Sequence, residues 1–226
     1  ERLGFDELFY IQLATLKARH DWKEKPSIEK LVVTANRAQV ASFIESLPFK
    51  LTNSQQKVLE EIFSDLEKDQ QMNRLVQGEV GSVKTIVAAI AAYLVYLNKL
   101  KILYMAPTEV LAFQHYATLT KILEPLGIKV GIYTGSRKYT KESKASKETK
   151  DSKGSKKNPT LSTPSTPHII VGTHALLSDK FEASDVGLGI VDEQQRFGVE
   201  QRTVLRNKAK VPHFLTMTAT PIPRTV

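Results

Sequence analysis

A short apolar strand that leads into a glycine-bearing turn constrains this chain more than any other feature. The strand is predicted at 75–77, the turn at 78–83, and a helix-forming run at 86–97. In the pattern G-x-x-x-x-G-K-[S/T], turn N–H groups converge on phosphates, the lysine neutralises their oxygens, and the hydroxyl ligates Mg²⁺. The residues that fit this pattern are Gly78, Lys84 and Thr85, with Gly81 and Ser82 inside the turn.

One position departs from the phosphate-loop pattern. Val83 stands where the pattern requires its second glycine. Glycine lets the backbone approach the phosphates and take a positive φ, which a β-branched residue tolerates badly. The stretch therefore indicates the ancestry of a phosphate loop and a weakened nucleotide affinity. A chance glycine turn between a strand and a helix would give similar letters, so the rest of the chain must decide.

The length and composition favour a large α/β domain, with or without an appendage. The chain has 226 residues, of which 41% are hydrophobic and 25% charged, as in ordinary globular domains. No run approaches the roughly 18 apolar residues of a membrane span, and the first residues lack signal-peptide character. We therefore expect an untargeted, cytoplasmic protein. The absence of cysteine excludes disulfides and thiolate metal sites, and the absence of an initiator Met suggests an excised fragment.

The net charge of +8 is concentrated in one segment. Between residues 137 and 157 there are nine Lys or Arg and three Asp or Glu, a net of +6, which leaves +2 for the rest of the chain. A basic surface normally indicates a nucleic-acid partner. Here the basic character belongs mostly to this segment, so the charge alone is weak support for such a partner.

Two helices are predicted before the phosphate-loop domain. Apolar residues recur at helical spacing over 3–16, which predicts an amphipathic helix that seeks a partner surface. Trp22 and Pro26 lie in a charged connector that is expected to end it. A second helix is predicted over 37–46. We therefore expect residues 1–48 to form a helical lead-in to a domain over 49–226.

The domain itself is predicted to begin with a capped helix. Thr52 and Gln55 form a capping box, and the residues of the inward stripe that follows are Val58, Leu59, Ile62, Phe63 and Leu66. The capping box explains Gln55 structurally. It is the more probable explanation unless a nucleotide site lies nearby.

Strands and helices then alternate, which predicts a mostly parallel sheet flanked by helices. A helix is expected from Glu109 to about Leu126, and the strands are predicted at 102–105, 129–133, 168–171, 188–191 and 213–217. Residues 138–167 break this rhythm, because lysine, serine and threonine dominate and apolar residues are nearly absent. Such a segment cannot bury enough surface to offset its ordering entropy, so a flexible insertion is predicted there.

Polar residues follow the predicted strands, at the edge where open parallel sheets bind ligands. Asp192 and Glu193 end one strand. One such carboxylate can hold Mg²⁺ and the next can orient an attacking water. An Asp-Glu pair is as often a helix N-cap, but together with Lys84 and Thr85 on what we expect to be a neighbouring strand it favours phosphoanhydride hydrolysis.

These stretches together resemble the first RecA-like motor lobe of RecG-type ATP-dependent DNA helicases, in superfamily 2. The resemblance covers roughly residues 49–225 in order, and 1–46 resemble the linker that joins a DNA-gripping wedge domain to the motor. The matching stretches are 49–55, 77–85, 105–112 with Gln114 and His115, 171–176, 191–202 and 217–225. The implied fold is a RecA-like P-loop NTPase lobe with an N-terminal helical extension.

The resemblance implies cofactors, partners and a role for each site residue. Gln55 would contact adenine. Gly78, Gly81, Ser82 and Lys84 would contact the phosphates of ATP, Thr85 and Asp192 the Mg²⁺, and Glu193 the attacking water. The residues that would contact the DNA backbone are Pro107, Thr108, Gly172, Thr173 and His174, and those that would couple hydrolysis to movement are Gln195, Thr218 and Thr220. Branched or forked DNA near the bacterial nucleoid would be the partner.

Three residues indicate which subgroup of helicases the chain resembles. Gln195 stands where RecG members usually carry His; it still donates and accepts hydrogen bonds but cannot take up charge. Gln194 stands where transcription-repair coupling translocases usually carry Glu, and together with Ala175 it favours RecG over those cousins.

Two other functions remain to be compared with that of a helicase lobe. The chain stops at Val226, so we expect the second lobe, with the arginine that stabilises the transition state, to be missing and the isolated lobe to be inactive. The alternative is a nucleotide-defective lobe that only grips DNA, because of Val83. A nucleotide kinase is a remoter reading, since that class has no use for Thr218 and Thr220 on a later strand.

Overall fold

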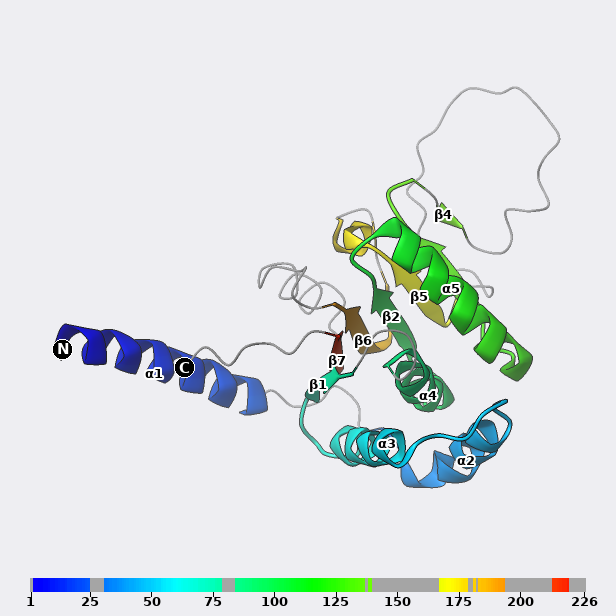
Figure 1. The fold of residues 1–226 in the computed structure, drawn as a ribbon, viewed down its shortest axis with the longest axis horizontal. Helices are drawn as coiled ribbons and strands as arrows, with labels where there is room; N and C mark the ends of the chain where they lie inside the picture. Colours follow the sequence, from blue (N-terminus) through cyan, green and yellow to red (C-terminus); the bar gives the residue numbers. More distant parts are fainter. Residues whose placement is uncertain are drawn as a thin grey trace.

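A seven-stranded sheet in the order β1-β7-β6-β2-β5-β3-β4 forms the centre of the molecule, a computed structural model (Figure 1). The structure describes residues 2–24, 31–78, 84–136, 138–139, 167–178, 181, 183–193 and 213–219. Every neighbouring pair of strands is parallel except β3 with β4. The predicted mostly parallel α/β sheet is confirmed.

The strands lie close to their predicted positions. They are β1 (Asn73–Gln77), β2 (Lys101–Met105), β3 (Val130–Tyr133), β4 (Lys138–Tyr139), β5 (Ile169–Gly172), β6 (Val186–Asp192) and β7 (His213–Thr218). Only β4 was not predicted. It pairs with Ile132 and Tyr133, so the first two residues of the predicted insertion belong to the sheet. The flexibility predicted for 140–166 lies outside the described residues.

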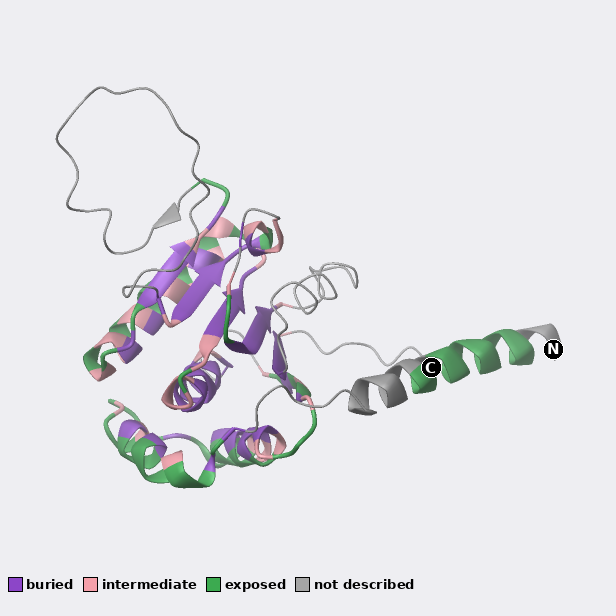
Figure 2. Ribbon diagram, turned by 180° about the vertical axis from the view of Figure 1, so that it is seen from behind, coloured by how far each residue is buried: buried purple, intermediate pink, exposed green. Residues whose placement is uncertain are grey.

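Four of the five described α-helices, α2 to α5, cover one face of the sheet in two layers (Figures 1 and 2). α4 packs on β2 and β6 and α5 on β3 and β5, while α2 and α3 lie against the outer side of α4. A helix that is apolar on every side must be buried on every side, and eleven of the fourteen residues of α4 are buried. The helices are α1 (Arg2–Glu24), α2 (Arg37–Glu45), α3 (Asn53–Leu66), α4 (Lys84–Leu97) and α5 (Glu109–Leu123).

Both faces of the sheet are buried, which explains the continuous apolar character of the strands. Ile102 and Tyr104 of β2 belong to the core cluster that includes α4 and α5. The alternate residues Leu103 and Met105 belong to a second cluster that includes Phe181. The period of two along the strand therefore divides β2 between two apolar layers.

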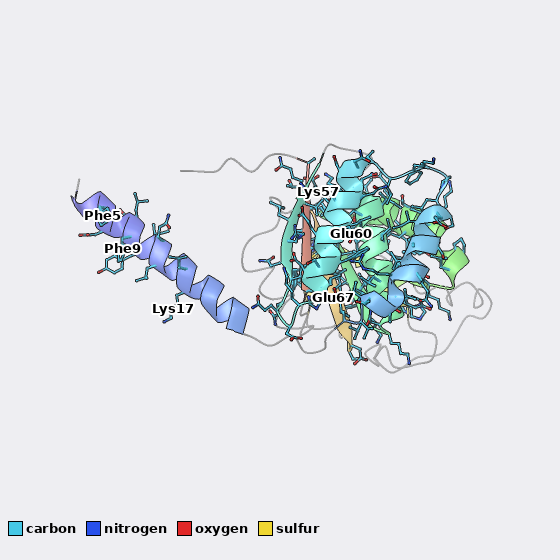
Figure 3. The ribbon with its side chains drawn as sticks, turned by 90° about the horizontal axis from the view of Figure 1, so that it is seen from below. Phe5, Phe9, Lys17, Lys57, Glu60 and Glu67 are labelled. Carbon is cyan, nitrogen blue, oxygen red and sulfur yellow. The ribbon has the colours of Figure 1, made fainter. Side chains whose placement is uncertain are left out.

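The N-terminal helix is longer than predicted. α1 continues to Glu24 and includes Trp22, so the prediction that Trp22 lies in a connector was wrong. No proline precedes Pro26, which itself lies outside the described residues. Figure 3 shows α1 projecting from the remaining elements, with Phe5 and Phe9 on it. These rings are 68% and 52% exposed, and the expected partner surface is not among the described residues.

The beginning of the main domain is fixed to the edge strand β1. The predicted capping box is confirmed: Thr52 Oγ1 accepts from the Gln55 N–H, and Gln55 Oε1 accepts from the Thr52 N–H at 2.7 Å. Arg74 of β1 donates to Asp65 and Glu61 of α3. Burial would raise the pKa of Asp65, but the hydrogen bonds from Lys68 and Arg74 outweigh it and lower that pKa. α3 is thus tied to the strand that leads into the phosphate-loop turn.

His213 at the start of β7 predicts an acid-sensitive stability. It is fully buried, its Nδ1 accepts the Met72 N–H at 3.1 Å, and burial lowers its pKa from 6.5 to about 4. Between about pH 4 and 6.5, His213 is therefore protonated in the unfolded chain and neutral in the folded chain. We expect the free energy of unfolding to fall as the pH drops from 6.5 toward 4, by up to about 1.4 kcal/mol per pH unit.

Denaturant unfolding at several pH values measures this slope. In His213→Asn, the amide oxygen can still accept the Met72 N–H but nothing titrates, so the slope should become shallower. His174→Asn, at an exposed histidine, is the matched control and should keep the slope of the parent chain. An unchanged slope in His213→Asn would contradict the assignment to His213.

Candidate active site

The carboxyl ends of five parallel strands meet at one edge of the sheet. Gln77 lies in register with Thr218, Met217 with Asp192, and Met105 with both Val191 and Gly172. The polar residues after these strands therefore share one edge, as predicted. The expectation that β1 and β6 are neighbours was wrong, because β7 lies between them.

Lys84 and Glu193 face each other across this edge. Lys84 is the first residue of α4 and is 8% exposed, with its Nζ 3.4 Å from Glu193 Oε1. Glu193 follows β6 directly and has a φ of 51°. A non-glycine residue in the left-handed region costs on the order of 1 kcal/mol or more and is often found at functional sites. The sharp bend after β6 is thus held by its surroundings, with the carboxylate beside the lysine.

Asp192 is held by hydrogen bonds to both of its carboxylate oxygens. Oδ1 accepts the Glu193 N–H at 3.1 Å, and Oδ2 lies 2.8 Å from His115 Nε2. His115 Nδ1 in turn lies 3.2 Å from the Tyr104 hydroxyl. Burial, and then the charge of Asp192, raises the pKa of Tyr104 well above its ordinary value, so the phenol keeps its proton.

The residues at this edge fit Mg²⁺ bound together with a nucleotide. Among the described residues no group of three or more His, Cys, Asp or Glu could form a metal cage. Mg²⁺ commonly takes one or two protein oxygens and completes its shell with phosphates and water. Each oxygen of Asp192 accepts one hydrogen bond and has a lone pair left, and Thr85 adds a hydroxyl. The donor set therefore suits Mg²⁺ and not a closed structural site.

Three further predicted site residues are held at the edge of the sheet that carries Lys84 and Asp192, or beside it. The Gly78 N–H donates to the Thr218 carbonyl at 3.2 Å, so the start of the predicted phosphate loop is fastened to β7. Thr218 is fully buried, and Gln55 is buried within its capping box. The box accounts for Gln55 structurally, and its contact with adenine stays a prediction.

The residues predicted to contact DNA lie at the ends of β2 and β5. Thr108 caps α5 by accepting the Leu111 N–H at 3.3 Å, next to the half-buried Pro107. Thr173 is buried, and the exposed His174 begins the 3₁₀ helix η4 (His174–Leu177).

A contact that the sequence did not predict joins the first residue of α5 to the turn after β3. Ser136 donates its hydroxyl and its N–H to the Glu109 carboxylate. The hydrogen bonds from the Ser136 hydroxyl and N–H lower the pKa of Glu109.

The close packing of β3 and Leu176 around position 172 explains why a glycine occupies it, which the sequence did not reveal. A Cβ built on it would lie 2.3 Å from the Tyr133 carbonyl oxygen of β3 and 2.8 Å from Leu176 Cγ. Because the nearest atom belongs to a paired backbone, it cannot move cheaply. We expect Gly172→Ala to lower the free energy of unfolding by about 1–3 kcal/mol, measured by denaturant unfolding.

Gly135→Ala is the matched control for Gly172→Ala. Its Cβ would meet only Glu109 Oε1, at 3.5 Å, and the change should stay within about 0.5 kcal/mol. Equal losses in the two variants would show that the close approach of β3 does not require glycine.

Several predicted residues lie outside the described part of the chain, and one important residue was missed. Gly81, Ser82, Val83, Gln195 and Thr220 are not described. His115 was noted within a matching stretch but given no role. It lies 77 positions before Asp192, on a helix, so no local spacing connects the two.

A mostly parallel sheet with Gly78, a buried lysine and two carboxylates at its carboxyl edge defines a RecA-like nucleotide-binding lobe. The model of the family described as DEAD/DEAH box helicase matches residues 52–226. This chain belongs to the DEAD/DEAH box helicase family. That membership confirms the predicted superfamily and implies the use of a nucleotide.

Relatives named ATP-dependent DNA helicase RecG match the whole chain. Identity is 43% to the protein of Synechocystis sp. and 40% to that of Aquifex aeolicus, of which the chain covers 25% and 27%. The chain thus spans about a quarter of these curated relatives.

The solved structure of RecG bound to a three-way DNA junction has a TM-score of 0.75 and 36% identity, over the whole chain and 28% of that protein. A hypothetical ATP-dependent RNA helicase of Sulfolobus tokodaii, at 18% identity and a TM-score of 0.56 over 83% of this chain and 51% of its own, shares the fold. No helix among the described residues is long and apolar enough to cross a membrane.

Proposed function

We propose that this chain is the ATP-binding motor lobe of an ATP-dependent DNA helicase or translocase of the RecG kind. The observation that carries the proposal is the meeting of Lys84, Asp192 and Glu193 at one edge of the sheet, in a chain similar to RecG over its full length. Residues 49–226 would form the lobe and 1–48 a helical linker to preceding parts of the whole protein.

The proposed chemistry is hydrolysis of ATP. Lys84 neutralises the β and γ phosphates, Thr85 and Asp192 hold Mg²⁺, and Glu193 orients the attacking water and accepts its proton. When bound, Mg²⁺ supplies positive charge to the phosphate oxygens. Gly81 and Ser82 would direct backbone N–H groups at the phosphates, and Gly78, whose own N–H donates to the Thr218 carbonyl, would fix the start of the loop. The Lys84 ammonium, which pairs with Glu193 in the structure, would turn to the phosphates and free the carboxylate.

The outer parts of the proposed site recognise the base and couple hydrolysis to movement. Gln55 already uses Oε1 in the capping box, which leaves its amide N–H groups for an adenine acceptor. Gln195, Thr218 and Thr220 would sense the state of the nucleotide. A second RecA-like lobe would supply an arginine for the transition-state charge, so this chain alone should turn over ATP poorly.

The proposed partner is branched or forked DNA. The RecG structure similar to this chain was solved with a three-way DNA junction. Thr108 and Thr173 each cap a helical segment, and exposed backbone N–H groups at such positions can bind phosphates without regard to base sequence. Pro107, Gly172 and His174 would complete this surface. Association of the whole protein with the bacterial nucleoid belongs to the same proposal.

DNA binding by this chain is expected to be weak and strongly dependent on salt. Outside residues 137–157 the chain carries only +2, and contacts to phosphates release counterions, so affinity falls as salt rises. Fluorescence anisotropy with a labelled three-way junction, from 50 to about 300 mM salt, measures this. Tight binding at the highest salt, or a preference for one base sequence, would contradict contacts to phosphates alone.

The central test is Mg²⁺-dependent binding of a non-hydrolysable ATP analogue. Calorimetry on the chain with Mg²⁺ and with EDTA should give binding that requires the metal, in parent chain and in Val83→Gly. Binding by neither form would contradict the proposal and favour the alternative of a lobe that only grips DNA. An exposed control, Glu45→Gln on α2, should bind as the parent does.

A further inference from the structure

We propose that His115 is a positioning residue that fixes Asp192 for Mg²⁺, with Tyr104 as its support. The inference rests on the proposed function, because it assigns a metal to Asp192. It adds two residues, from β2 and α5, whose hydroxyl and imidazole would not touch the metal or the nucleotide. Their effect would be exerted through the orientation of one carboxylate.

The hydrogen-bond chemistry fixes the direction of this connection. An ionised carboxylate only accepts, so the 2.8 Å contact requires that His115 Nε2 donate to Asp192 Oδ2. With the proton on Nε2, the neutral ring accepts at Nδ1, and the Tyr104 hydroxyl 3.2 Å away donates to it. The imidazole is therefore held at both nitrogens, and the carboxylate cannot rotate without losing its Nε2–H partner.

Burial makes this connection more than a surface contact. Tyr104 is fully buried in the sheet, and the Tyr104 and His115 rings lie 4.7 Å apart between centroids. The side chains of His115 and Asp192 are 13% and 9% exposed. Water has little access to replace a lost partner at such a position, so removal of the imidazole should leave the carboxylate poorly oriented.

The second proposed metal ligand acts on the same tyrosine. The interaction with the Thr85 side chain lowers the pKa of Tyr104, against the larger effect of burial. Thr85 on α4 and Asp192 on β6 thus each lie beside a member of the Tyr104–His115 pair.

A purely structural role for His115 makes a different prediction. If the ring only fills space between α5 and the sheet, its loss should lower stability and reduce every mode of nucleotide binding together. If the ring orients Asp192, its loss should weaken the Mg²⁺-dependent part alone. Metal ligands that lose such an outer partner typically lose 10- to 100-fold in metal affinity.

The test titrates Mg²⁺ against the chain in the presence of a fluorescent non-hydrolysable ATP analogue. We expect His115→Ala to raise the half-saturating Mg²⁺ concentration by about 10- to 100-fold, with analogue affinity in EDTA within about twofold of the parent. His115→Gln should restore the Mg²⁺ response to within about threefold, since its amide can donate to Asp192 and accept from Tyr104. Tyr104→Phe should shift the response in the same direction as His115→Ala, but less.

Control variants separate the possible failures. His168→Ala removes a histidine that contacts Tyr96 just before β5. This position is at the amino-terminal edge of the sheet, opposite the carboxyl edge that carries the site, so the Mg²⁺ response should be unchanged. Circular dichroism melting of each variant reports folding. Equal Mg²⁺ responses in His115→Ala and the parent, or equal damage in the Ala and Gln variants, would overturn the positioning role. A parent chain that binds the analogue without any response to Mg²⁺ would contradict the proposed function itself.

Discussion

Replacing Glu193 by glutamine is expected to reduce ATP turnover by at least about 100-fold in a protein that joins this chain to a second RecA-like lobe. Proton transfer by a positioned base typically contributes 10²- to 10⁴-fold, and an amide cannot accept the proton of the attacking water. Affinity for the Mg²⁺–analogue complex should stay within about threefold, because Lys84, Thr85 and Asp192 are unchanged. Single-turnover hydrolysis and calorimetry on the same preparations measure the two effects.

Because Glu193 lies beside Lys84, the experiment must separate loss of the base from loss of the lysine's partner. Glu45→Gln removes a carboxylate from the exposed side of α2 and should leave turnover unchanged. Hydrolysis at the parent rate by Glu193→Gln would exclude this carboxylate as the base. A joint loss of binding and turnover would mean that Glu193 mainly holds the lysine.

Replacing Val83 by glycine is expected to tighten binding of a non-hydrolysable ATP analogue by at least about tenfold. In a phosphate loop, the residue before the lysine has its backbone against the phosphates, and strain there costs on the order of 1–3 kcal/mol. At about 1.4 kcal/mol per tenfold, this corresponds to a weakening of roughly 5- to 150-fold in the parent chain. The buried Lys84 and its partner Glu193 are in place, so the defect should be repairable.

The matched experiment for Val83→Gly places Lys84→Ala in the glycine background. The double variant should lose the gain, because the phosphates then lack their cation. Calorimetry on all three proteins gives the comparison. Equal affinity of the parent and Val83→Gly would mean that the loop takes a shape that never needed glycine.

The local elements could be predicted from the sequence because each has a local cause. Continuous apolar runs gave the buried strands, and Thr52 with Gln55 gave the start of α3. The carboxyl-edge site followed from the rule that parallel strands end together. Lys84 and Glu193 could thus be predicted to meet, although they are 109 positions apart.

The remaining features depend on packing between distant segments. The position of β7 between β1 and β6 is a property of strand order, which no local pattern encodes. His115 lies on a helix whose spacing indicates only a packed face, and its contact with Asp192 arises from the crossing of α5 over the sheet. Gly172 resembled a ligand-binding glycine, whereas the approach of the Tyr133 carbonyl requires it.

The strand order has a mechanical consequence for this RecA-like lobe. β7 forms ladders with β1 on one side and β6 on the other, and its Thr218 carbonyl also holds the Gly78 N–H. A force applied to the segment after Thr218 would therefore act at once on β1, which leads toward Lys84, and on β6, which ends at Asp192. Neither side can shift alone without shearing a parallel ladder. β7 lies between β1 and β6 and is paired with both of them. A displacement of the segment after β7 would therefore be transmitted to both neighbouring strands.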